Sequence, residues 1–287
     1  LLAAFSISLN AQSLQDNFVM EDSVFLEQDS ALHFIEEEKF VNDTLVPQQD
    51  SVPYYYRING PYLKTYVHDL KHTVTAPFRW QGRDWLKLGI IGGSAGILMF
   101  TADKAAREMV LRNQKEAFKS FSKVMYPFGN RLPPVLLAGL YATSLVTKNR
   151  RLEHVTLSAT KSLAISTVVY TSSKALIRRQ RPTRTDDPLN FVAPFTKKGF
   201  TSFPSGHANT AFSVATAFAM HYKDVKWVPW VAYSLASLTA LSRLYDDRHW
   251  VSDVLIGASV GHFITRGIYK LDEKRKNAGR PDLKTFN

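Results

Sequence analysis

Six apolar runs from residue 86 onward constrain the fold more than any other feature of the sequence. They are rich in Ala, Leu, Ser, Gly and Thr, and they cover residues 86–102, 132–146, 155–176, 208–222, 227–241 and 251–268. Small residues let helix backbones approach closely, so runs of this composition predict packed helices. We find no fixed-period repeat and no alternating pattern long enough to build a sheet. The sequence therefore predicts an all-α fold, a six-helix bundle.

Flanking charge favours a bundle that spans a membrane, whereas the length of the runs does not decide between a membrane and a soluble bundle. A span needs about 20 mostly apolar residues, and several of these runs are nearer to about 15, as buried helices of a soluble bundle would be. Lys161 lies inside the third run, where we expect it to snorkel or to meet a polar group. Basic residues flank the runs at 148–151 and 266–280, as cytoplasmic flanks do. We predict a transmembrane bundle, with a soluble bundle as the alternative.

Charge divides the chain into two unlike parts. Residues 1–50 hold ten acidic residues and one basic residue, whereas residues 51–287 hold 35 basic and 15 acidic residues. A basic folded part favours an anionic partner, which can be nucleic acid, a membrane surface or a phosphorylated substrate. The absence of cysteine excludes a disulfide scaffold, a thiolate zinc site and a cysteine nucleophile.

These patterns predict four segments. Residues 1–15 resemble the remnant of a signal peptide or a simple apolar N-terminus. Residues 16–80 read as an acidic leader followed by an aromatic pre-domain segment, in which an interfacial amphipathic helix and local core packing are equally compatible with the pattern. Residues 81–270 form the helical-bundle domain, and residues 271–287 form a basic tail.

The first of three polar motifs ends the third apolar run. Lys174 and Arg181 are seven residues apart, about two helical turns, which predicts that both project from one helix face. Pro182 disfavours helix at the preceding residue, so the Arg181 guanidinium is expected where the helix opens into a loop. Taken alone, this motif is typical of an ordinary basic helix C-terminus.

The second motif directly precedes the fourth run. Ser205 is placed as an N-cap, so Gly206 and the next residues would offer free backbone N–H groups to an anion. Glycine also lets a ligand approach the backbone closely, and His207 would stand beside that anion in the first turn. A plain Pro-Ser cap with an incidental histidine explains the pattern equally well.

The third motif follows Arg243 at the end of the fifth run. His249 and Asp253 have i, i+4 spacing, which predicts neighbours on one helix face. The carboxylate could then accept a hydrogen bond from one imidazole nitrogen and leave the other free to act as a nucleophile. The alternative is a surface ion pair. Residues 246–248 are predicted to solvate a loop.

Taken together and in this order, the motifs resemble the signature blocks of the type-2 phosphatidic acid phosphatase superfamily, which includes membrane lipid phosphatases, soluble acid phosphatases and vanadium haloperoxidases. The blocks match at every defining position and read Lys174-x6-Arg181-Pro182, Pro204-Ser205-Gly206-His207 and Ser242-Arg243-x5-His249-x3-Asp253. The resemblance implies that His249 attacks phosphorus to form a phosphohistidine, that Asp253 orients His249, and that His207 acts as acid and then as base. It assigns phosphate binding to Lys174, Arg181, Ser205, Gly206 and Arg243, with no metal and no cofactor.

The resemblance and the predicted bundle imply a phosphatase for a phosphate monoester or diphosphate ester on a membrane lipid, with its site on the periplasmic or extracytoplasmic face. A cleaved signal peptide would invert a bundle with an even number of helices, so a soluble exported acid phosphatase of broad specificity stays open. A non-catalytic anion-binding membrane protein is the alternative from another class. The expected partners are a phosphorylated lipid or other phosphate ester and a membrane. Nothing in the sequence supports nucleic-acid binding or indicates an oligomeric state.

Overall fold

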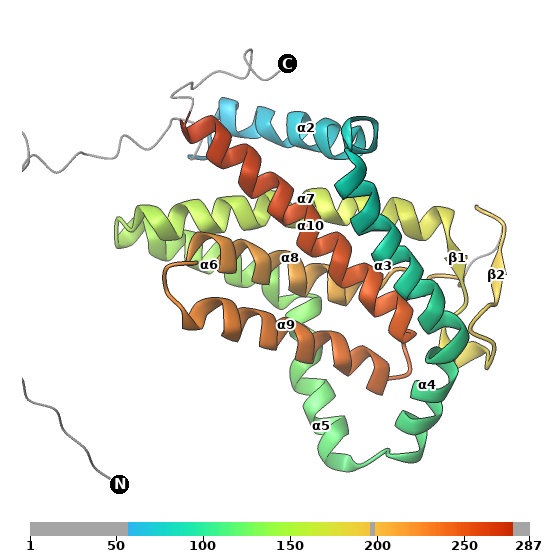
Figure 1. Ribbon diagram of the computed structural model, residues 1–287. Coiled ribbons are helices and arrows are strands. Elements are labelled where there is room, and N and C mark those ends of the chain that lie inside the picture. Colours follow the sequence, from blue (N-terminus) through green and yellow to red (C-terminus); the bar gives the residue numbers. More distant parts are fainter. Residues whose placement is uncertain (1–56, 196–198, 278–287) are drawn as a thin grey trace, which may run out of the picture. The chain divides into compact units, whose positions relative to one another are not determined.

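The computed structural model describes residues 57–195 and 199–277. The predicted N-terminal signal remnant, the acidic leader and residues 278–287 of the predicted tail lie outside this part of the chain. Within the described ranges the chain forms nine α-helices, three short 3-10 helices and one two-stranded ladder (Figure 1). The prediction of an all-α fold is confirmed.

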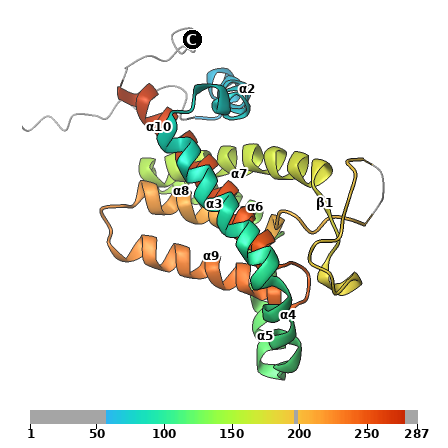
Figure 2. The ribbon, with the colours of Figure 1, turned by 45° about the vertical axis from the view of Figure 1, so that its right-hand side comes forward.

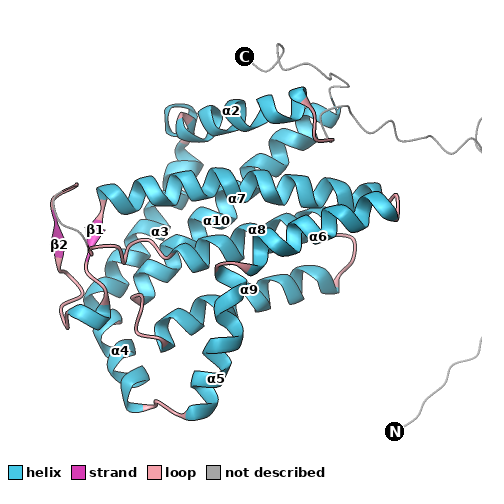
Figure 3. Ribbon diagram, turned by 180° about the vertical axis from the view of Figure 1, so that it is seen from behind, coloured by secondary structure: helices cyan, strands magenta, loops and turns pink. Residues whose placement is uncertain are grey.

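Each of the six apolar runs forms a helix. These helices are α3 (Gly82–Thr101), α6 (Leu132–Val146), α7 (Arg150–Leu176), α8 (Gly206–His221), α9 (Trp227–Tyr245) and α10 (Val251–Asn277). α8 packs against α7, α9 and α10, and α6 packs against α7 (Figure 3). Gly257 and Gly261 bring α10 close to α8, because a Cβ atom at either glycine would lie 2.3 Å from a main-chain oxygen of Ser205 or Asn209.

Three further helices form in segments that the apolar pattern did not mark. They are α2 (Gly60–Val74), α4 (Asp103–Arg112) and α5 (Glu116–Met125), followed in two cases by the 3-10 turns η2 (Ala76–Arg79) and η3 (Tyr126–Gly129). The six-helix count is therefore too low for the described residues. Charged residues interrupt the short helices α4 and α5, so they resemble polar links in the sequence. Figures 1 and 2 show this pair extending from the bundle on the side where α9 ends.

A long connection joins α7 to α8 and carries the end of the first motif, Arg181-Pro182, and the start of the second, Pro204-Ser205. Its strands β1 (Arg178–Arg179) and β2 (Phe191–Val192) pair antiparallel, with η4 (Pro182–Arg184) between them. Proline fits the first turn of a helix because its missing N–H would have no partner there. The main-chain N–H of Ser202 donates to the carbonyl of Arg179 at 3.0 Å, which returns the end of the connection to its start.

Helix length and composition bear on the predicted membrane spans. Among the described helices, none alone is both long and apolar enough to cross a membrane. α3 and α4, which meet at a 56° bend, pass the same length and composition test as a pair.

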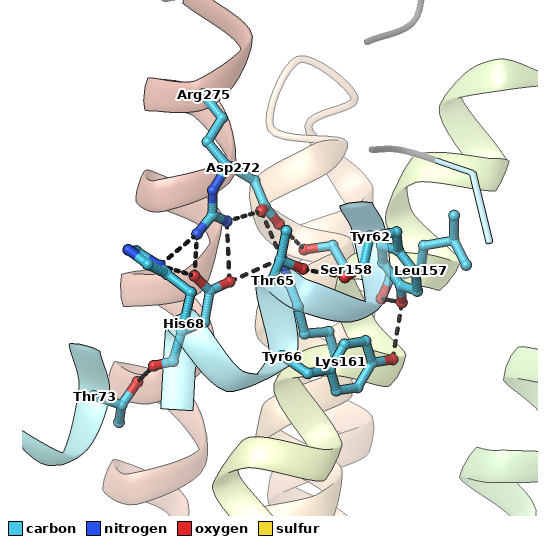
Figure 4. Close-up of polar contacts among 11 residues, drawn as sticks. Tyr62, Thr65, Tyr66, His68, Thr73, Leu157, Ser158, Lys161, Asp272 and Arg275 are labelled. Atoms are coloured by element: carbon cyan, nitrogen blue, oxygen red, sulfur yellow. Dashed lines mark hydrogen bonds and ion pairs between the residues drawn. The ribbon is translucent and has the colours of Figure 1, made fainter. Parts of the chain in front are cut away.

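A buried set of four charges, which we name the α2 cluster, joins α2 to α7 and α10 (Figure 4). Lys161 of α7 lies 2.9 Å from a carboxylate oxygen of Asp69 and 2.7 Å from one of Asp272. Arg275 pairs with the same two carboxylates, at 2.9 Å in the case of Asp272. Lys161 therefore meets polar groups inside the bundle and does not snorkel. Arg275, which the sequence placed in a basic tail, is only 1% exposed.

Candidate active site

The three motifs meet at one end of the bundle, where α7 ends, α8 begins and the α9–α10 loop lies. The main-chain N–H of Ser205 donates to the carbonyl of Asp253 at 2.9 Å. The indole N–H of Trp250 donates to the carbonyl of Gln180 at 3.0 Å. These two bonds tie the third motif to the second and to the first, so all three share one site.

The first motif differs from its predicted geometry. Lys174 lies in the last turn of α7, but this helix ends at Leu176, and Arg181 lies beyond β1 with extended backbone angles. The prediction that both project from one helix face is therefore wrong, because the chain leaves the helix between them. Burial and the charge of Arg181 nevertheless lower the pKa of Lys174 to about 8.

Neither cation of the first motif has a carboxylate partner within the described residues. The Lys174 ammonium donates to the carbonyl of Thr201 at 2.9 Å. The Arg181 guanidinium forms no side-chain hydrogen bond or ion pair within residues 57–195 and 199–277. Burial and the positive charge of Arg248 lower the pKa of Arg181. The two side chains therefore form a cationic surface with no carboxylate in ion-pair contact, although the Asp253 charge opposes the lowering of both pKa values.

The second motif caps α8, as the sequence predicts. Ser205 is the N-cap, and its hydroxyl accepts from the main-chain N–H of Ala208 at 3.5 Å, a long contact. A Cβ atom at Gly206 would lie 3.1 Å from the ring of Tyr170, so a larger residue here would press on that ring. His207 follows in the first turn. Its buried Nε2 atom has no hydrogen-bond partner in the described structure, so it can bind an incoming group.

The turn η3 supplies a wall of the site that none of the motifs contains. The ring of Tyr126 lies 5.0 Å from the ring of His207, and the Arg243 guanidinium lies 4.9 Å from the Tyr126 ring. A Cβ atom at Gly129 would lie 2.7 Å from the His207 Cβ, so only glycine fits against this histidine. The Tyr-Pro-Phe-Gly sequence signals a turn, but it does not show where that turn lies.

The buried Arg243 of the third motif is held by groups from α5 and from its own loop. It pairs with Asp246, which also accepts from the hydroxyl of Ser122 at 2.6 Å. Asp247 lies 2.8 Å from the guanidinium of Arg107 on α4. The prediction that these two acids only solvate a loop is therefore wrong. Their partners lie on α4 and α5, the helices that the sequence did not predict.

His249 and Asp253 are neighbours, though not on one helix face. α10 begins at Val251, so His249 precedes the helix, and its Nδ1 atom lies 3.7 Å from Asp253 Oδ2, longer than a hydrogen bond. The same Oδ2 atom accepts from the Ser202 hydroxyl at 2.5 Å and from the main-chain N–H of Trp250 at 3.0 Å. Asp253 thus caps the start of α10, as an acid at the third helical position does. The predicted hydrogen bond is not formed in this state.

Both histidines of the site are neutral at pH 7. Burial lowers the pKa of His249 to about 4, with Lys174 and Arg181 lowering it further and Asp253 opposing them. Burial and the Arg243 charge lower the pKa of His207 to about 3. A neutral imidazole carries a lone pair that can attack an electrophile. Neutral imidazoles beside uncompensated cations suit an anionic electrophile.

Comparison with known proteins supports the resemblance that the motifs carry. The sequence model of the PAP2 superfamily matches residues 156–277. The chain is 49% identical over 61 residues to "Lipid A 1-phosphatase" of Porphyromonas gingivalis, covering 21% of this chain and 14% of that protein. It is 34% identical over 100 residues to "Probable diacylglycerol pyrophosphate phosphatase 1" of Schizosaccharomyces pombe, covering 29% of this chain and 36% of that protein. The chain therefore spans less than half the length of either relative.

The fold is similar to that of a solved structure. The crystal structure of a transmembrane PAP2-type phosphatidylglycerolphosphate phosphatase from Bacillus subtilis matches with a TM-score of 0.52 and 22% identity, covering 71% of this chain and 96% of that chain. At 22% identity this similarity is evidence for the fold alone. All positions of the three signature blocks, from Lys174 to Asp253, lie inside residues 156–277, the segment that matches the PAP2 superfamily model.

Proposed function

We propose that this protein is a phosphatase that hydrolyses a phosphate monoester or diphosphate ester of a membrane lipid through a phosphohistidine intermediate, without a metal ion. One observation carries the proposal. The half-buried cations Lys174 and Arg181 have no carboxylate within ion-pair distance in the described structure and lie beside two neutral imidazoles. Phosphoryl transfer needs mainly positive charge and positioning, which these residues supply.

In the proposed first step His249 is the nucleophile. Its Nδ1 atom lies on the side of Asp253, so the lone pair that attacks is on Nε2. The new P–N bond forms as the P–O bond to the leaving group breaks, and His207 gives a proton to the leaving oxygen. In the second step His207 takes a proton from water, whose oxygen displaces His249 from phosphorus. Inorganic phosphate leaves, and both imidazoles return to their starting state.

The low pKa of His207 in the free site is compatible with its role as an acid. Arg243, Arg181 and Lys174 lower this pKa along with burial. A bound phosphate group brings negative charge to the same place, so it opposes the effect of the three cations and raises the pKa of His207. Substrate binding would then protonate His207 when a proton is needed. Ser205 and Gly206 add neutral donors at the start of α8.

The names of the relatives support a lipid substrate and a membrane location. Lipid A and diacylglycerol pyrophosphate are both phosphorylated lipids. Basic residues gather at the far ends of α7 and α10 from the site, among them Arg150, Arg151, Lys274 and Lys276. Because such residues favour the cytoplasmic side, we propose that the site opens on the extracytoplasmic face.

The test is phosphate release from undecaprenyl diphosphate, phosphatidylglycerol phosphate, phosphatidic acid, lipid A and a soluble phosphomonoester. We expect a lipid to be preferred and His249→Ala to abolish release, because no nucleophile remains. His262→Ala, a change at a histidine that bonds Thr216 and Tyr233, is the matched control and should stay active. Retained turnover in His249→Ala contradicts the mechanism, and preference for the soluble ester contradicts the lipid assignment. Adding an impermeant phosphate ester to intact cells tests the face, since hydrolysis is expected only from outside.

A further inference from the structure

Behind the catalytic pair lies a second buried set of charges, formed by Asp253, Arg179 and Asp103. The Arg179 guanidinium donates to Asp253 Oδ1 through Nη1 and to Asp103 Oδ2 through Nη2, both at 2.7 Å. All three side chains are 0% exposed. None of them was assigned a phosphate-binding role, and neither Arg179 nor Asp103 is a defining position of the three signature blocks.

The Arg179 guanidinium is fixed by contacts along its whole length, so a shift of one carboxylate would shift the other. Its Nε atom donates to the carbonyl of Pro188 at 2.8 Å. Its guanidinium lies 5.3 Å from the ring centre of Trp250 and 5.4 Å from that of Phe191. A guanidinium bonded at both ends of its planar fork has little freedom to turn. Moving Asp103 would therefore move or free the group that holds Asp253.

Asp103 comes from outside the matched segment 156–277 and reaches the site through the bend between α3 and α4. It is the first residue of α4 and also binds the start of α10. Its Oδ1 atom accepts from the main-chain N–H of Ser252 at 3.0 Å, and its Oδ2 atom accepts from the Ser252 hydroxyl at 2.6 Å. The residue next to Asp253 is thus fixed by the same carboxylate.

We propose that Asp103 is a positioning residue for the reaction, which acts through Arg179 to hold the Asp253 carboxylate against His249. The inference rests on the proposed phosphatase function. It assigns to α4 a part in catalysis that none of the motifs indicates. Asp103 does not touch the reacting atoms, so its contribution is to placement and charge.

The charge of this set suits the proposed chemistry. Two carboxylates and one guanidinium leave one net negative charge behind His249. Attack on phosphorus turns the neutral imidazole into a positively charged phosphoimidazolium, which that charge stabilises. The cations Lys174 and Arg181 have the opposite effect on His249, because they lower its pKa whereas Asp253 raises it. Neutralising Asp103 would leave Arg179 and Asp253 as a neutral pair and would remove this support in the charged intermediate.

The experiment compares two substitutions that separate charge from size. Asp103→Asn keeps the shape but removes the charge and turns an acceptor into a donor facing Arg179 Nη2. Asp103→Glu keeps the charge but adds a methylene group to a site that is 1% exposed. We expect Asp103→Asn to lower kcat by about ten- to a hundredfold with KM within about twofold of wild type, as outer partners of catalytic groups do. Asp103→Glu should retain more activity than Asp103→Asn.

Asp69→Asn is the matched control, because Asp69 is an equally buried carboxylate bonded to an arginine, at the far end of α7 and α10. It should lower the unfolding temperature but leave kcat unchanged below that temperature. If Asp103→Asn matches wild-type kcat, or retains more activity than Asp103→Glu, the inference is overturned while the phosphatase function stands. If wild type releases phosphate from none of the substrates, the proposed function fails and the inference fails with it.

Discussion

Two lysines of α7, the buried Lys161 and the half-buried Lys174, have opposite surroundings. Lys161 and Lys174 are separated by about 20 Å along this helix at 1.5 Å per residue. Lys161 has carboxylate oxygens of Asp69 and Asp272 within 2.9 Å. Lys174 donates to the carbonyl of Thr201 at 2.9 Å and has the like charge of Arg181 nearby, while the Asp253 charge acts on it without an ion pair. Carboxylates neutralise the lysine charge at the Lys161 end of the helix, which we call the closed end. At the Lys174 end, which we call the open end, no carboxylate is in ion-pair contact, so an anion can bind there.

This difference separates a structural use of charge from a functional one. Burying an uncompensated cation costs free energy, so the fold supplies counter-ions wherever the charge serves only to join helices. Arg275 and the two acids of the α2 cluster follow that rule. Lys174 and Arg181 depart from it. Such departures gather at functional sites, where the ligand supplies the missing charge.

The largest effect is expected from removing an uncompensated cation. Arg181→Ala should lower kcat/KM for the preferred substrate by about 10³-fold, because charge on the transferring phosphoryl group would lose a main partner. Steady-state phosphate release measures it. Arg248→Ala is the control, because Arg248 carries the same charge near Arg181 but is exposed. A loss of similar size in both variants would show that only the general positive field matters.

At the closed end the expected effect is on stability. Lys161→Met removes one of the two cations, Lys161 and Arg275, that pair with both Asp69 and Asp272. The loss of this buried charge should lower the free energy of unfolding by about 3–5 kcal/mol. Denaturant unfolding in detergent measures the loss. The double variant Lys161→Met with Asp272→Asn restores neutrality and should recover part of it. Additive losses in the double variant would mean that the charges are not coupled.

A smaller effect is expected from mild acid, and it should appear at the open end first. The pKa of His249 is lowered to about 4, so between its ordinary value and pH 4 the unfolded chain binds a proton that the folded chain does not. Stability therefore falls as pH drops below about 6.5, by about 2 kcal/mol at pH 5 for this group. Burial raises the pKa of Asp69, but the paired Lys161 and Arg275 outweigh it and lower this pKa to about 2, so its contribution is lost only below about pH 4.

Hydrogen exchange at pH 7 and pH 5 distinguishes the two ends. Protection factors around residues 249–253 should decrease more than those in α2. A His249→Gln variant should show a smaller decrease at the site. Equal losses of protection at both ends would contradict the assignment of the acid response to the site.

The sequence predicted the elements whose signal is local. Each of the six apolar runs became a helix, and Ser205 became an N-cap, because helix periodicity and capping depend on neighbouring residues. The sequence predicted that α7 continues to about Arg181, whereas this helix ends at Leu176. Leu176 and Ile177 give no sign of a break, and Pro182 limits only the residue before it.

Partners distant in sequence could not be predicted. Asp246 and Asp247 look like loop acids until α4 and α5 bring Arg107 and Ser122 to them. The same holds for Lys161, whose acidic partners are 92 residues before it and 111 residues after it. Helix periodicity contains no information about such pairs. Only a three-dimensional structure or a set of homologous sequences can supply it.

The glycine in η3 has a consequence for exchanging parts between related enzymes. Gly129 leaves room for His207, and Tyr126 from the same turn contacts both His207 and Arg243. This turn precedes the segment 156–277 by nearly thirty residues. A chimaera that transplants residues 156–277 alone would therefore inherit His207, the proposed acid and base, from one parent and the surface that accommodates it from another. Swaps that carry the turn with the signature blocks should keep turnover, whereas swaps that separate them should lose it.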